Sequence, residues 1–123
     1  MLADQDIMAF VPTTDPVRGR AFYEGVLGLK VTDEDPYGIM FDANGTRLRM
    51  SVVGELVPAP YTILSWVVKD VRSVVRALQG KGVAFERYGF MEQDEWGVWR
   101  SPEGAQIAWF KDPDGNTLSV AEL

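Results

Sequence analysis

Residues 15–31 read DPVRGRAFYEGVLGLKV, and this stretch decides the fold. Asp15 places a carboxylate where it can accept a hydrogen bond from the first backbone N–H groups of a helix, and Pro16 has the fixed φ that suits a first helical residue. Apolar side chains then recur at helical spacing until Gly28, where the helix is expected to end. Strand-forming residues follow at 29–32. The stretch predicts a capped helix that is followed directly by a strand.

Three further strands complete the first half of the chain around this helix. Strand character precedes the helix at 6–11 and resumes after it at 38–43 and 46–53. The last two segments are separated by Asn44 and Gly45, a pair that is typical of a two-residue hairpin turn. The first half therefore reads β-α-β-β-β.

The second half repeats this order of elements. Asp70 takes the part of Asp15, ahead of a helix whose apolar residues recur at helical spacing until Gly80. The expected strands of this half lie at 61–68, 83–85, 105–110 and 117–123. The repeat indicates an internal duplication, with module one at about 1–53, a proline-containing linker at about 54–60 and module two at about 61–123.

Composition narrows the possible functions. The 123 residues suit one domain, and the chain contains neither cysteine nor histidine, so thiolate nucleophiles, imidazole bases and zinc–thiolate sites are excluded. A net charge of -6 with scattered arginines disfavours nucleic acid, because phosphate neutralisation needs a concentrated basic face. The apolar runs are too short for a membrane span, and the first six residues do not resemble a signal peptide. We expect a cytoplasmic protein.

Two segments carry a resemblance to a known family. Residues 15–31 and residues 108–120, AWFKDPDGNTLSV, resemble the most recognisable segments of the vicinal oxygen chelate superfamily, the glyoxalase, bleomycin resistance and extradiol dioxygenase fold. The resemblance implies one α+β domain over 1–123, in which two tandem β-α-β-β-β modules form a curved mixed sheet around a cleft. It also implies a homodimer. Because the fold hosts enzymes and metal-free binding proteins, it does not choose the function.

The resemblance also locates the metal ligands of metal-dependent relatives. Counting from the two capping aspartates and from the DPDG turn gives Met8, Ile63 and Ser119, and matching the segment TRLRMS to the last strand of the first half gives Arg49. A thioether, a guanidinium, an alkyl chain and a hydroxyl are unsuited to a divalent first-row metal. We therefore expect no metal and no cofactor.

The same strands predict what lines the cleft instead. Alternate residues of a strand share a face, and a two-residue turn at 44–45 pairs Met40 with Arg49. The expected ligand-binding residues are Met8, Phe10, Met40, Arg49, Ile63, Trp96, Trp99, Ile107, Trp109, Thr117 and Ser119. A largely apolar lining with a few polar groups is typical of a small-molecule site.

Plainer interpretations of these residues stay open. Arg49 could be a solvated strand residue or pair diagonally with Asp42, although a charge on an interior strand of this fold needs a counter-ion or a ligand. Some of the apolar residues could simply fill a closed core; these are Met8, Met40, Ile63 and Trp109.

Residues 87–99, RYGFMEQDEWGVW, lack strand or helix periodicity and mix large apolar side chains with carboxylates. Such a segment could be a flap over a cleft or a subunit contact. Its aromatic and acidic residues would suit a planar cation, whereas Arg49 would suit an anion. The charge of the ligand is left open by the sequence.

Two classes of function remain. The favoured one is a metal-free protein that binds an aromatic natural product or an antibiotic. The alternative is a metal-independent lyase or isomerase of the same superfamily, with Arg49 as electrophile and a carboxylate such as Asp42 as base. A fold that is kept for protein interaction alone is the third possibility, and a filled cleft would favour it.

Overall fold

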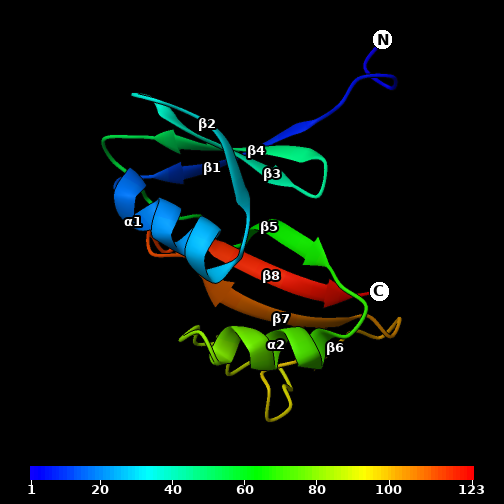
Figure 1. Ribbon diagram of the computed structural model, residues 1–123. Helices are drawn as coiled ribbons and strands as arrows, with labels where there is room; N and C mark the ends of the chain where they lie inside the picture. Colours follow the sequence, from blue (N-terminus) through cyan, green and yellow to red (C-terminus); the bar gives the residue numbers. More distant parts are fainter. The chain divides into compact units, whose positions relative to one another are not determined.

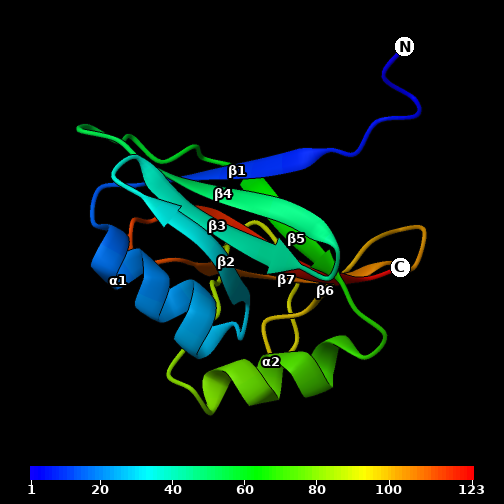
Figure 2. The ribbon, with the colours of Figure 1, turned by 45° about the horizontal axis from the view of Figure 1, so that its top comes forward.

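A computed structural model describes all 123 residues, which divide into two units, 1–57 and 58–123. The division falls inside the stretch expected to link the two modules. Each unit contains one four-stranded mixed sheet, drawn in Figures 1 and 2. None of the helices is long and apolar enough to cross a membrane.

The first unit forms sheet A, in the order β1-β4-β3-β2. Its elements are β1 (Met8–Thr13), α1 (Pro16–Arg20), η1 (Ala21–Val26), β2 (Lys30–Asp35), β3 (Gly38–Ala43) and β4 (Thr46–Val52). Strand β1 is parallel to β4, and the other pairs are antiparallel. The predicted helix is present as α1 and continues as the π-helical η1. Asp15 caps it, accepting a hydrogen bond from the Arg18 N–H at 3.1 Å.

The hairpin between β3 and β4 has the predicted turn and register. Asn44 and Gly45 both have positive φ, 52° and 92°, as a two-residue turn that matches the strand twist requires. Met40 consequently lies opposite Arg49, as expected.

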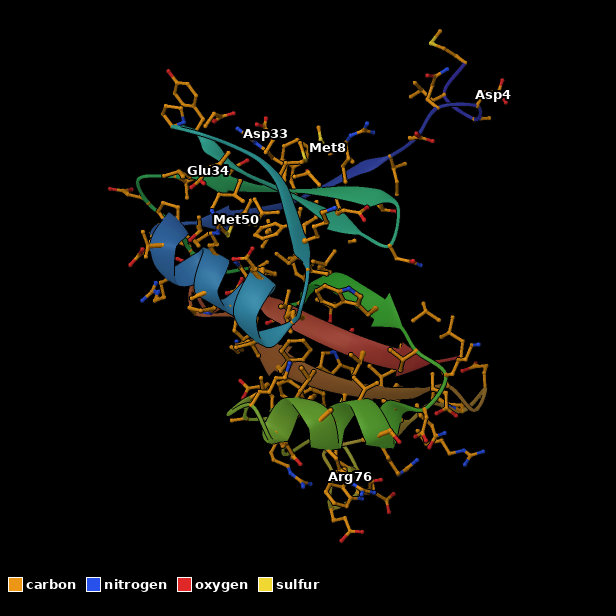
Figure 3. The ribbon with its side chains drawn as sticks, viewed as in Figure 1. Asp4, Met8, Asp33, Glu34, Met50 and Arg76 are labelled. Atoms are coloured by element: carbon orange, nitrogen blue, oxygen red, sulfur yellow. The ribbon has the colours of Figure 1, made fainter.

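One face of sheet A packs against the helical segment. Gly19 and Tyr23 supply the buried helical surface, and a Cβ on Gly19 would lie 2.6 Å from the sulfur of Met50. The buried strand residues are Val11, Thr13, Ile39, Phe41, Leu48 and Met50. Figure 3 shows Met50 between the sheet and the helix and Met8 on the opposite face.

The second unit forms sheet B, in the order β5-β8-β7-β6. Its elements are β5 (Thr62–Val67), α2 (Val71–Gln79), β6 (Trp99–Arg100), β7 (Gln106–Lys111) and β8 (Thr117–Glu122). Strand β5 is parallel to β8, and the rest is antiparallel. Asp70 caps α2 as predicted, and Glu122 accepts a second hydrogen bond from the Val71 N–H at 3.0 Å.

The second strand expected in this module differs from the prediction. Residues 83–85 were expected to form a strand, but only Phe85 pairs, in an isolated bridge with Phe110. The short β6 pairs with the far end of β7 instead. Residues 86–98 are inserted between these two pairings, and this insertion interrupts the outer strand.

The α+β class with two tandem β-α-β-β-β modules is confirmed. In sheet B, Val71 and Val75 of α2 are fully buried, and so are Ala108, Phe110 and Leu118 of the sheet. Because side chains alternate along a strand, the neighbours of these strand residues occupy the face opposite α2.

Candidate functional site

The second unit contains a pocket of about 490 Å³, a size that is ordinary for a small-molecule site. Its lining residues are Pro60, Tyr61, Thr62, Tyr88, Phe90, Met91, Trp109, Lys111 and Thr117. The strands contribute its floor, and the segment after Phe85 contributes its aromatic wall. The pocket belongs to the face of sheet B that lies opposite α2.

A row of three polar side chains crosses the floor. Strand pairing sets Thr62 of β5 beside Thr117 of β8, and Thr117 opposite Lys111 of β7. The Lys111 Nζ lies 3.4 Å from the Thr117 Oγ1. Thr62 Oγ1 accepts a hydrogen bond from the indole N–H of Trp109 at 3.0 Å, and this bond fixes the orientation of the indole ring.

Aromatic rings form the wall. The Tyr88 ring lies 5.7 Å from the ring of Phe90 and 5.7 Å from that of Trp109, the latter edge-on. Such pairs hold each other in place beyond the effect of area alone. Phe90 is still 84% exposed, so most of its apolar surface faces solvent until something covers it.

Three ionisable side chains line the pocket, those of Tyr61, Tyr88 and Lys111. Burial raises the pKa of the Tyr88 hydroxyl, and the charge of Glu86 adds to the effect, so the phenol stays protonated and can donate a hydrogen bond at neutral pH. Lys111 is the only charged residue among the lining residues, and no aspartate or glutamate is among them.

The segment that carries Tyr88 and Phe90 is anchored at its base. The Gln93 amide donates to the Glu86 and Gly97 carbonyls at 3.0 and 2.8 Å and accepts from the Tyr88 N–H at 2.8 Å. The Arg87 guanidinium donates to two backbone carbonyls farther along the segment. The tip at Phe90 is thus exposed, while its two ends are tied together.

The structure brings together only part of the predicted site. Trp109 and Thr117 line the pocket, and Ser119 and Ile107 share their face of the sheet without lining it. The Ser119 hydroxyl is engaged with the Ser65 hydroxyl at 2.7 Å. Trp99 is 6.1 Å from the Trp109 ring but lines a second, more polar hollow of about 330 Å³ beside β6.

Two predicted residues, Ile63 and Trp96, do not line this pocket. The pairing of β5 with β8 shifts between Thr62 and Leu64, so Thr62, and not Ile63, reaches the pocket. Trp96 lies under the Arg76 guanidinium of α2, 5.6 Å from the ring centroid. Figure 3 shows Arg76 on the side of α2 turned away from the sheet, so Trp96 does not line the pocket.

The predicted residues of the first unit form a row on sheet A. Phe10, Arg49 and Met40 are direct neighbours across β1, β4 and β3. Met8 and Phe10 are 44% and 56% exposed, so neither fills a closed core. Their role as ligand contacts stays a prediction.

Arg49 has a partner that the sequence did not predict. Its Nη2 donates to both carboxylate oxygens of Asp35 on β2, at 3.0 and 3.1 Å. The diagonal pairing with Asp42 is wrong, because the Asp42 carboxylate accepts from the Gly45 N–H in the hairpin turn. The argument that Arg49 needs a ligand as counter-ion is therefore removed.

Comparison with protein-family models shows the family to which this chain belongs. The model of the Glyoxalase/Bleomycin resistance protein/Dioxygenase superfamily matches residues 6–120. The chain belongs to this superfamily.

Solved structures of the glyoxalase superfamily have the same fold. A superfamily member from Sphaerobacter thermophilus aligns with a TM-score of 0.77 at 22% identity, covering 100% of both chains. A glyoxalase family protein from Enterococcus faecalis gives 0.77 at 18% identity over 99% of this chain and 100% of the other. The lactoylglutathione lyase from Agrobacterium tumefaciens gives 0.73 at 19%, over 96% and 93%. At these identities the likeness shows the fold alone. Comparison with curated proteins gave no match.

The side chains at the four positions that the sequence resemblance assigns to metal ligands do not fit a divalent cation. Of the four, Arg49 is cationic and bound to Asp35, and Ser119 is bound to Ser65. Met8 and Ile63 offer no oxygen or nitrogen ligand. The structure contains no group of three or more acidic side chains placed to hold a metal ion.

Several pocket residues of this glyoxalase relative were missed from the sequence. Thr62 and Lys111 sit beside predicted strand residues, and counting two positions on from Trp109 along β7 would have found Lys111. Tyr88, Phe90 and Met91 lie in the segment that was singled out for its aromatic content, but nothing in its pattern tells which residues turn toward the sheet.

Proposed function

We propose that this protein binds an aromatic small molecule in the pocket of the second unit, and that binding needs no metal ion. The observation that carries the proposal is the pocket itself, in which four aromatic residues stand beside a floor of two threonines and one lysine. An apolar lining with a few oriented polar groups is the usual composition of a ligand site.

The exposure of Phe90 supports the same conclusion. A phenyl ring that is 84% exposed has a free-energy cost in water, and an aromatic ligand would cover it while contacting Tyr88 and Trp109. The two ends of the segment 86–98 are already tied together, so the loss of conformational entropy on ligand binding is smaller.

The enzyme alternative has less support. Its proposed electrophile, Arg49, is bound to Asp35, and its proposed base, Asp42, accepts a hydrogen bond from the hairpin turn. Neither residue lines the pocket. The homodimer and the cytoplasmic location stay predictions.

Calorimetric titration with an uncharged probe, naphthamide, tests the proposal. The protein is first treated with a chelator, then titrated with and without added divalent ions. We expect one site per chain and an affinity that metal addition leaves unchanged. Binding that appears only after a divalent ion is added would contradict the metal-free part.

Matched variants locate the site. Phe90→Ala changes an exposed residue at little risk to folding, and Trp109→Leu removes the central ring; each is expected to weaken binding about tenfold, as for a well-packed aromatic contact. Trp96→Leu is the control, because Trp96 packs on α2. Equal losses in all three variants would place the ligand elsewhere.

A further inference from the structure

We infer that the pocket selects aromatic acids that carry a single negative charge, and that Lys111 holds the acidic group. This inference rests on the proposed function, and it addresses the ligand charge that the sequence left open. It is carried by the charge of the lining residues and by the position of Lys111 in the strand register.

The pocket offers one positive charge and no negative one. Lys111 is the only ionised residue among the lining residues. It takes part in none of the ion pairs of this protein, and its ammonium contacts only the Thr117 hydroxyl, at a long 3.4 Å. Two of the three ammonium protons therefore remain for an acceptor from the ligand.

The neighbouring carboxylates are directed elsewhere. Asp112 follows Lys111 in the chain, but its carboxylate accepts from the backbone N–H groups of Asp114 and Asn116 and from the Asn116 side chain, at 2.8 to 3.0 Å. Glu86 influences Tyr88 without lining the pocket. No carboxylate of the protein therefore pairs with Lys111, and its exposed ammonium group is accessible to an acidic ligand.

The arrangement of groups also sets the geometry of the ligand. Lys111 and Thr117 lie side by side on the floor, while Tyr88 and Phe90 form the wall. A ligand whose aromatic ring packs against the wall and whose carboxylate lies at the edge of that ring would contact both the wall and the polar floor. One lysine in a chain of net charge -6 disfavours a doubly charged group such as a phosphate monoester.

Four probes with the same ring system test the inference: naphthoate, naphthamide, naphthylmethylamine and naphthyl phosphate. Titrated by calorimetry, naphthoate is expected to bind about threefold to tenfold more tightly than naphthamide, the range of a partly solvated charge-assisted contact. The amine is expected to bind more weakly than the amide, and the phosphate no more tightly than naphthoate. Raising the ionic strength from about 0.05 M to about 0.5 M should reduce only the preference for naphthoate.

Lys111→Gln should abolish the preference for naphthoate, so that acid and amide bind the variant with equal affinity. Lys30→Gln is the matched control, because it removes the same charge from β2 in the first unit. Equal affinities of acid and amide in the unmodified protein, or a preference that survives in Lys111→Gln, would overturn the inference while leaving the proposed function intact. If none of the four probes binds, the proposed function fails and the inference fails with it.

Discussion

The position of Arg49 depends on its ion pair with Asp35 and on the absence of a side chain at Gly38. Only 15% of its side chain is exposed, and both oxygens of Asp35 hold its guanidinium. Asp35 pairs across the sheet with Gly38, and a Cβ on Gly38 would lie 3.1 Å from the guanidinium carbon. The glycine therefore leaves the space through which Arg49 reaches β2. The hydrogen bonds from Arg49 lower the pKa of Asp35, so the pair persists well below neutral pH.

A variant pair tests whether Arg49 serves stability or ligand binding. We expect Asp35→Asn and Arg49→Gln each to lower the melting temperature, and the double variant to lose less than the sum, because the two side chains act as a unit. Naphthamide affinity in Arg49→Gln should stay within about twofold of the unmodified protein, as for a residue outside the site. A larger loss of affinity would restore Arg49 as a ligand contact.

The sequence predicts on which face of a sheet a strand side chain lies, but it does not predict the residue that pairs with Arg49. The alternation that puts Trp109 and Thr117 on one face follows from the strand period, and Asn44-Gly45 fixes the pairing of Met40 with Arg49. The partner of Arg49 lies on β2, whose register shifts between Val31 and Asp33. An irregularity of this kind leaves no mark in a hydrophobic pattern.

At the scale of elements, the inserted segment 86–98 distinguishes the second module. Asp94 ties it to α2, accepting from Arg72 at 2.6 and 3.1 Å and from the N–H groups of Trp96 and Val98 at 2.9 and 3.0 Å. Arg72 also donates to Gln106 of β7 at 2.6 Å. The segment that carries the aromatic wall is thus connected to both the helix and the sheet.

The pKa of Asp94 gives this anchoring a pH dependence. Burial would raise that pKa, but the hydrogen bonds from Val98, Arg72 and Trp96 outweigh it, and the pKa is lowered. A lowered folded-state pKa means that the stabilisation is present above the unfolded-state value of about 3.9 and is lost as the pH falls through the folded-state value.

Asp94→Asn should therefore lower the free energy of unfolding by about 1–2 kcal/mol at neutral pH, since one charged acceptor of several hydrogen bonds is replaced. The gap between variant and unmodified protein should close below about pH 3.9. Urea denaturation at a series of pH values measures both. Glu95→Gln is the control, because the Glu95 side chain is exposed. A gap that stays constant down to low pH would show that the carboxylate charge of Asp94 is not what anchors the segment.

The positions of the elements were mostly predictable, and the exceptions have a physical cause. Capping aspartates, a helical apolar period and turn residues mark the helices and most strands. The predicted strand at 83–85 failed because backbone pairing, and not side-chain type, decides whether three apolar residues join a sheet; only Phe85 does. β6 is two residues long, which is too short to produce a period.

At the scale of the whole molecule, the fold consists of two copies of the β-α-β-β-β module, and the candidate site lies in the second unit. Both modules pair their first and last strands in parallel after the same capped-helix design. The four positions that the sequence resemblance assigns to metal ligands are Met8, Arg49, Ile63 and Ser119 in this chain. The pocket that we propose instead is built from the face of sheet B and the inserted segment.

The most direct test is a nuclear magnetic resonance titration that follows the indole N–H signals of the four tryptophans in the presence of a chelator. With naphthoate, we predict a saturable shift of the Trp109 signal, whose N–H is bound to Thr62, and little change at Trp96, which packs on α2. Trp66 pairs with Val120 on the helix-facing side and should also stay unchanged. Four unmoved signals, or a Trp109 shift that requires an added divalent ion, would contradict metal-free binding in this pocket.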